Sequence, residues 1–82
     1  KRSMSELESI KNVEFTARQA EVEAAAFAKV GDTGLAASQY RFAASQWKAI
    51  GESRARLGNA SGAEEAYKRH LDLLVKSGGK AA

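Results

Sequence analysis

The chain has 82 residues, enough for one small domain and too few for two independent cores. It has no cysteine and one histidine, which excludes a disulfide framework, a thiolate zinc site, a cysteine nucleophile and a multi-histidine metal centre. The net charge of +3 is well below that of a dedicated nucleic-acid-binding domain, and the lack of proline with many alanines favours helix over strand.

Targeting signals are missing from these residues. No apolar run approaches the ~18–20 residues of a membrane span, and no charged-then-apolar leader resembles a secretory signal. Since the chain opens at Lys1 rather than at methionine, we interpret it as a segment of a longer protein. A segment without cysteine, signal or membrane span is expected in the cytoplasm.

The first predicted helix covers roughly residues 5–30. Ser3 and Ser5 each precede a glutamate by three residues, which is the capping-box pattern of a helix start. Apolar residues three and four apart then form one stripe: Leu7, Ile10, Val13, Ala17, Ala20, Ala24 and Phe27. A second apolar set lies off that stripe: Phe15, Val22, Ala26 and Val30.

Two interpretations of the second set remain open. In one, both apolar faces are buried inside a three-helix core. In the other, Phe15 and Val22 meet a second copy of the chain, a partner or a flanking repeat, because a helix with two apolar faces has more to bury than one neighbour covers.

The second predicted helix covers residues 34–57. Gly31 suits the left-handed position past a helix end, and Asp32 or Thr33 is placed to cap the next helix. The strongest apolar periodicity in the sequence follows: Ala36, Tyr40, Ala43, Trp47, Ile50 and Leu57. Gly51 lies inside this helix, where it costs about 1 kcal/mol relative to alanine, so the helix either continues through it or bends there.

The third predicted helix covers residues 62–77, after a corner at Gly58 and Asn59. Ser61 and Glu64 form another capping box. Its apolar stripe also contains the histidine: Ala63, Ala66, Tyr67, His70, Leu71, Leu73 and Leu74. We expect residues 1–79 to form a single helical domain and residues 80–82 to form a loose tail.

One stretch resembles a family. Its large residues, glycines and small residue follow in the order of a tetratricopeptide repeat, a helix-turn-helix of 34 residues: Trp47, Ile50, Gly51, Gly58, Ala63 and Tyr67. The resemblance is best over residues 44–77. It implies helical hairpins in which Gly51 permits close packing, Ala63 is the small residue of the second helix and Tyr67 its aromatic.

A second copy of part of this pattern lies upstream, where Gly31, Ala36 and Tyr40 repeat the offsets of Gly58, Ala63 and Tyr67. The copies are 27 residues apart rather than 34, and Arg54 replaces an aromatic of the pattern. We therefore expect an all-α fold: an antiparallel three-helix bundle of tetratricopeptide-like hairpins, whose long middle helix serves both corners. Microtubule-interacting-and-trafficking-type domains are similar in size, but have no counterpart to Trp-x-x-Ile-Gly.

The sequence predicts no catalytic, cofactor-binding or metal-binding residue. His70 lies on an apolar stripe, as a packed histidine does. Glu64 and Glu65 suit the positive end of a helix dipole and need no acid–base role. The glycine corners lack the lysine and Ser/Thr of a phosphate loop. We expect that the chain is not an enzyme.

Binding surfaces are the better candidates. In tetratricopeptide proteins the concave side holds partner peptides, often by their carboxylates, and by this resemblance Gln46, Lys48, Ser53 and Arg54 are the candidate contacts. The alternative is that these are ordinary solvated residues beside a core.

The leading hypothesis is therefore a protein–protein interaction module that holds a peptide or protein segment, acidic in character, within a larger assembly. An alternative is a structural domain that self-associates through the first helix, at Phe15 and Val22. A third is a weak nucleic-acid contact through basic residues of the second and third helices, which the low net charge makes the least favoured.

Overall fold

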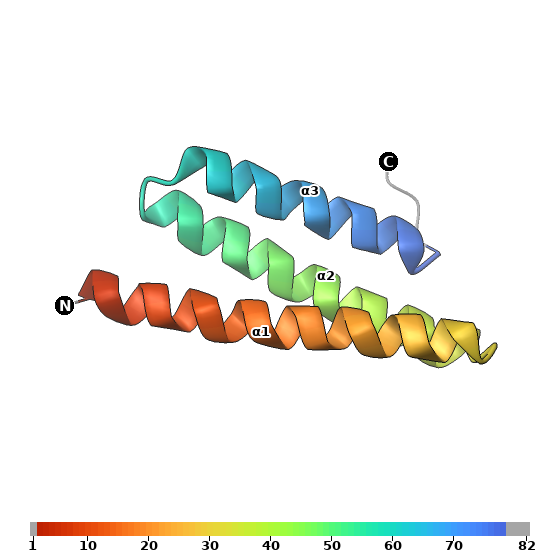
Figure 1. Ribbon diagram of the computed structural model, residues 1–82. Coiled ribbons are helices and arrows are strands. Elements are labelled where there is room, and N and C mark those ends of the chain that lie inside the picture. Colours follow the sequence, from red (N-terminus) through yellow and green to blue (C-terminus); the bar gives the residue numbers. More distant parts are fainter. Residues whose placement is uncertain (1, 79–82) are drawn as a thin grey trace.

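The computed structural model describes the backbone of residues 2–78 and the side chains of residues 5–78. It consists of three helices, α1 (Arg2–Lys29), α2 (Thr33–Arg56) and α3 (Ala60–Lys76), with no strand in this part of the chain. Consecutive helices run antiparallel (Figure 1), so the predicted all-α three-helix bundle is confirmed. Helix ends differ by one to three residues from those expected, and the predicted tail at 80–82 lies outside the described residues.

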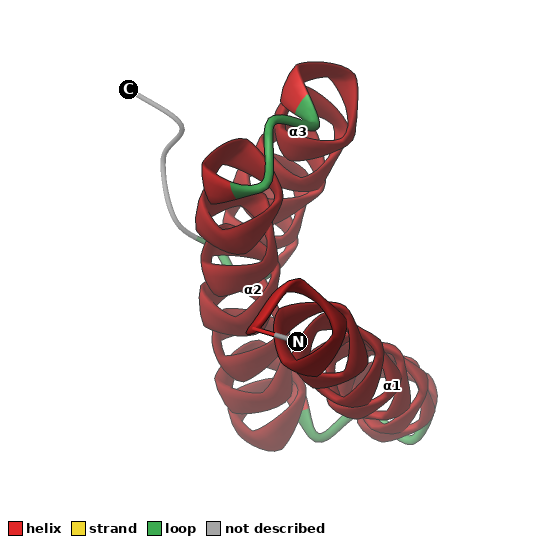
Figure 2. Cartoon of the chain, turned by 90° about the vertical axis from the view of Figure 1, so that its left-hand side faces the viewer, coloured by secondary structure: helices red, strands yellow, loops and turns green. Residues whose placement is uncertain are grey.

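The bundle is open rather than closed. Helices α1 and α3 each pack along α2, and they do not pack against each other. Seen end-on, α1 and α3 project from α2 toward the same side (Figure 2). The extents along the principal axes are 45 × 26 × 13 Å, so the molecule is half as thick as it is wide. The helices therefore form one curved layer with a concave face between α1 and α3.

Glycine ends the first two helices as the sequence predicted. Gly31 has φ +85° and Gly58 has φ +84°, the left-handed conformation that side chains with a Cβ avoid. A Cβ at either position would meet no atom within 4 Å, so backbone conformation rather than space favours glycine there.

Each of the two corners also supplies an N-cap. The side chains of Asp32 and Asn59 accept hydrogen bonds from the backbone N–H three residues on, at 3.2 and 2.9 Å. The cap at Asp32 was expected, but the capping box predicted from Ser61 and Glu64 is wrong. Helix α3 already begins at Ala60, so Ser61 lies in its first turn.

The core is built mainly from alanine. Among residues 5–78, eight of the twelve buried hydrophobic residues are alanines, which lets the helix backbones approach closely. The four larger side chains in it are Ile10, Trp47, Ile50 and Leu73. Leu7 and Leu71, predicted on the apolar stripes, are instead 51% and 48% exposed, because such a thin layer buries only the centre of each stripe.

Helix α2 continues through Gly51, which is buried against α3. A Cβ built on Gly51 would lie 2.6 Å from Cε1 of Tyr67, closer than side chains approach. The Tyr67 ring therefore lies directly on the backbone of α2. It is 37% exposed, so this tyrosine covers the edge of the core rather than filling its centre.

Candidate functional site

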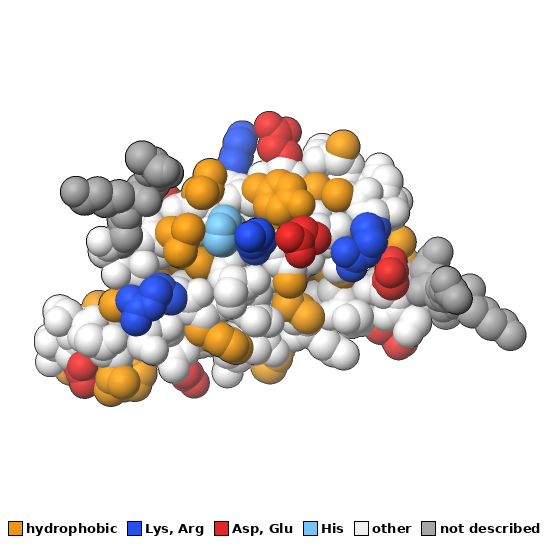
Figure 3. Space-filling view, turned by 180° about the vertical axis from the view of Figure 1, so that it is seen from behind, with side chains coloured by type: hydrophobic (Ala, Val, Ile, Leu, Met, Phe, Trp, Pro, Cys, Tyr) orange, Lys and Arg blue, Asp and Glu red, His pale blue; other side chains and the backbone are white. Residues whose placement is uncertain are grey.

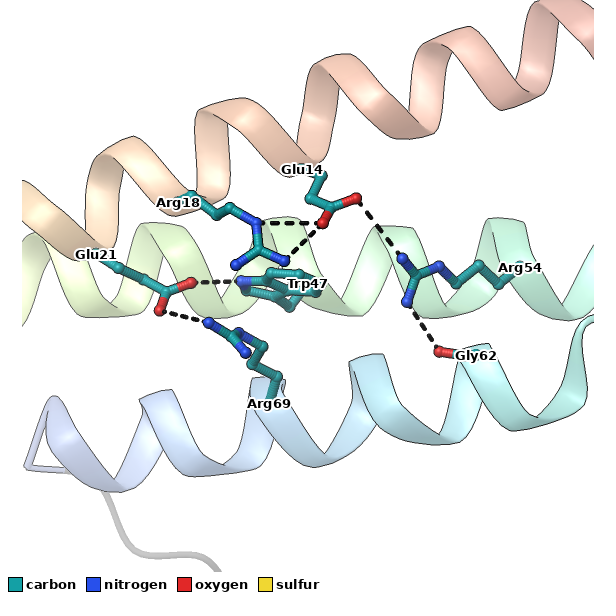
Figure 4. Close-up of polar contacts among 7 residues, drawn as sticks. All are labelled: Glu14, Arg18, Glu21, Trp47, Arg54, Gly62 and Arg69. Carbon is teal, nitrogen blue, oxygen red and sulfur yellow. Dashed lines mark hydrogen bonds and ion pairs between the residues drawn. The ribbon is translucent and has the colours of Figure 1, made fainter.

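The concave face is centred on Trp47, whose side chain is 2% exposed. Its indole Nε1 donates a hydrogen bond of 2.7 Å to one carboxylate oxygen of Glu21 on α1. The other oxygen of Glu21 accepts from Arg69 on α3 at 3.3 Å (Figure 4). One carboxylate thus connects all three helices, including the two that do not pack on each other.

Two guanidinium groups lie against the same indole. The Cζ atoms of Arg18 and Arg69 are 5.3 and 4.8 Å from the centre of the Trp47 ring, within the range of a cation–π interaction. Arg18 is held in place by Glu14, one turn earlier on α1, at 2.7 Å. The tryptophan is therefore covered by the protein's own cations, and its role is structural.

Arg54, a predicted contact residue, belongs to the same polar network. Its Nη1 donates to the carbonyl oxygen of Gly62 at 3.1 Å, and its Nη2 lies 3.7 Å from Glu14 (Figure 4). The side chain is only 19% exposed. Arg54, on α2, therefore connects the first turn of α3 to α1 and lines the concave face.

A concavity of about 520 Å³ opens at this end of the concave face, beside Arg54. It lies between α1 and the end of α2. Its walls combine apolar side chains with three charged groups and one amide: Leu7, Ile10, Leu57, Lys11, Glu14, Arg54 and Asn59. Sequence reasoning placed only Arg54 of these at a binding site. The sequence does contain a pattern that predicts this site. In an antiparallel pair, the start of the apolar stripe on the first helix lies beside the end of the stripe on the second.

The other predicted contacts on α2 do not line the concavity with Arg54. Gln46 and Lys48 are two positions apart, so they project about 200° apart around the helix. Gln46 and Ser53 are half-buried, and the Ser53 hydroxyl accepts a hydrogen bond from Arg56 at 2.9 Å. Lys48 is exposed. The structure thus separates Lys48 from Arg54 and leaves the four without a common surface.

Phe15 and Val22 are 68% and 65% exposed on α1. The interpretation that both apolar faces of the first helix are buried in the core is therefore wrong. An open layer has one neighbour for α1, and that neighbour covers one face. Phe15 and Val22 remain available to a partner.

The single histidine has a structural partner. Nδ1 of His70 lies 2.8 Å from the carbonyl oxygen of Ala44, which assigns the proton to Nδ1 as donor. Within the described residues, no three acidic, histidine or cysteine side chains gather as a metal site would require.

On the face opposite the concave one, Lys and Arg do not form a continuous patch but are spread among acidic and hydrophobic side chains (Figure 3). Among the basic residues of the second and third helices, Arg54, Arg56 and Arg69 have carboxylate partners within 4.0 Å. The third hypothesis, nucleic-acid contact, gains no support from this distribution.

None of the described helices combines the length and apolar character that crossing a membrane requires. Comparison with protein-family models, curated proteins and solved structures found no match to this chain. The functional interpretation therefore depends on the geometry of the concave face and on the exposed side of α1.

Proposed function

We propose that the chain is a non-enzymatic protein-interaction module that holds a short acidic peptide on its concave face. The observation that carries the proposal is the concavity beside Arg54, where an apolar wall meets cationic groups. Such a surface suits a peptide with one bulky apolar side chain and a nearby carboxylate. The apolar side chain would contact Leu7 and Leu57, and the carboxylate would face Lys11 and Arg54.

The two cations have different roles in this proposal. Arg54 is oriented by the Gly62 carbonyl and partly neutralised by Glu14, so it offers a fixed donor with little free charge. Lys11 is exposed and takes part in none of the ion pairs formed by described residues. An ion pair between Lys11 and a peptide carboxylate is therefore expected to contribute more to binding than one with Arg54.

The likeness to a tetratricopeptide repeat adds support. The resemblance makes Gly51 a close-packing glycine and Tyr67 the aromatic of the next helix, and here the Tyr67 ring packs on Gly51. Since tetratricopeptide hairpins present a concave side to peptides, the position of the concavity on this side is consistent with a peptide-binding role.

The test is a selection of peptide ligands from a displayed library of random 12-residue sequences. We expect enriched peptides to combine acidic residues with a bulky apolar one. Lys11→Glu should weaken their binding about threefold to tenfold, as loss and reversal of one partly exposed ion pair would. Leu7→Ser should weaken it as well, because Leu7 is half exposed at the wall and its replacement leaves the core intact.

The matched control is Lys48→Glu, which makes the same change of charge on a different surface. Lys48 is exposed and lies outside the concavity, so its reversal should leave binding within twofold. Equal losses of peptide affinity for Lys11→Glu and Lys48→Glu would mean that binding depends only on the net charge of the chain. That result, or a selection with no enriched peptides, would refute the proposed site.

A further inference from the structure

Helix α1 carries a row of four exposed side chains at seven-residue intervals: Glu8, Phe15, Val22 and Lys29. Seven residues fall about 20° short of two full helical turns, so neighbours in the row are nearly in line and the whole row drifts by about 60° around the helix. The row is about 30 Å long at 1.5 Å per residue. It has an acidic end, an apolar centre and a basic end.

This row faces away from the rest of the chain. The buried side of α1, which includes Ala17 and Ala24, packs on α2, and Phe15 and Val22 lie on the opposite side. Figure 2 shows α1 projecting from the other two helices with its far side uncovered. Two large apolar side chains, each about two-thirds exposed, therefore have no partner among the described residues.

We propose that this row binds the same row of a second copy, with the two α1 helices antiparallel. Glu8 and Lys29 share their midpoint with Phe15 and Val22. A twofold axis at that midpoint therefore places Phe15 against Val22 of the second copy at both ends of the apolar centre. The same axis places Glu8 opposite Lys29 of the second copy, so two ion pairs close the ends of the contact.

Charge complementarity fixes the direction of pairing. A parallel arrangement in register would put Glu8 against Glu8 and Lys29 against Lys29, which is repulsive at both ends. Antiparallel helices also align their dipoles favourably. Arg18 lies near the proposed axis, but its guanidinium is turned toward Glu14 and Trp47 and stays clear of its symmetry mate.

The row overlaps the peptide concavity at Lys11, which lies three residues after Glu8 and four before Phe15, whereas Leu7, Arg54 and Leu57 lie off the row. Leu7→Ser and Phe15→Glu therefore test the peptide site and the dimer separately.

The dimer is tested by sedimentation velocity from micromolar to millimolar concentration. We expect a mass that rises from 8.8 kDa toward twice that value. Phe15→Glu should raise the dimer dissociation constant about 100-fold, while Leu71→Glu, at a comparably exposed apolar position on α3, should leave it unchanged.

Charge exchange tests the direction of pairing. Glu8→Lys and Lys29→Glu each create like charges at both ends of the homodimer and should weaken it about threefold to thirtyfold. An equimolar mixture of these two variants should recover the wild-type dissociation constant, because opposite charges then face each other at both ends. A constant single-chain mass, a dimer insensitive to Phe15→Glu, or a mixture no tighter than the separate variants would overturn the proposal.

Discussion

The contact between Gly51 and Tyr67 determines whether Gly51→Ala raises or lowers the free energy of unfolding. Helix propensity alone predicts an increase, and the contact predicts a decrease. Alanine in place of a helical glycine stabilises a helix by about 0.5–1 kcal/mol. At Gly51, however, the new Cβ would lie 2.6 Å from Cε1 and 2.8 Å from Cδ1 of Tyr67. The ring would have to move off the α2 backbone, and overpacking of this kind costs about 1–3 kcal/mol.

We therefore expect Gly51→Ala to lower the free energy of unfolding by about 1 kcal/mol, the difference between these two effects. For a domain of this size that loss lowers the midpoint of thermal unfolding by about 4–8 °C. Urea denaturation followed by circular dichroism measures the change directly, and an unchanged slope would show that the unfolded state is unaffected.

Two further variants isolate the cause. In a Tyr67→Ala background the ring is gone, so Gly51→Ala should now stabilise the chain by about 1 kcal/mol. Gly34→Ala is the matched control, because a Cβ at Gly34 would have only one neighbour, 4.0 Å away. It should be neutral or stabilising by less than about 1 kcal/mol. If Gly51→Ala destabilises equally with and without Tyr67, the proposed contact is not the cause.

Two other substitutions test the polar network over the concave face. Trp47→Phe removes the hydrogen bond to Glu21, so a partly buried carboxylate loses a donor. The free energy of unfolding, measured with denaturant, should fall by about 1.5–3 kcal/mol. A change below about 0.5 kcal/mol would contradict a stabilising role for this hydrogen bond. Arg54→Gln removes the ion pair with Glu14 and the donor to the Gly62 carbonyl, and should cost about 1–2 kcal/mol. Arg56→Gln loses an exposed ion pair at 4.0 Å and an exposed hydrogen bond to the Ser53 hydroxyl, and should change stability by less than about 0.5 kcal/mol. Equal effects of the two arginine variants would refute the distinction.

The sequence was a good guide to helices and corners because local rules govern both. Gly31 and Gly58 were placed correctly since a positive φ is a property of a few neighbouring residues. The cap at Ser61 was misplaced because Asn59 is an equally good capping residue two positions earlier, and the choice between them depends on the geometry of the corner.

The packing of the helices against one another was harder to predict from the sequence than the helices themselves. Apolar periodicity marked the stripes, but it could not tell a closed bundle from an open layer. That choice decides whether Phe15 and Val22 are buried or exposed. The network around Trp47 joins residues 26 and 48 positions apart, and nothing in their local sequence pairs Glu21 with either Trp47 or Arg69.

The predicted binding site was inaccurate for the same reason, because it was chosen without knowledge of the helix packing. Gln46, Lys48, Ser53 and Arg54 are close in sequence, but a helix distributes such neighbours around its axis. Arg54 alone lines the concavity, whose other walls come from α1, from Leu57 after α2 and from Asn59 in the second corner. A site assembled from segments 40 or more residues apart becomes visible only when the packing of the helices is known.

The most direct test of the interaction-module account is to map where a selected peptide binds, using amide chemical shifts of the isotope-labelled chain. The account places the largest shifts around the concavity, at Leu7, Lys11, Arg54 and Leu57. Shifts confined to Phe15 and Val22, or spread evenly over exposed residues, would contradict binding on the concave face.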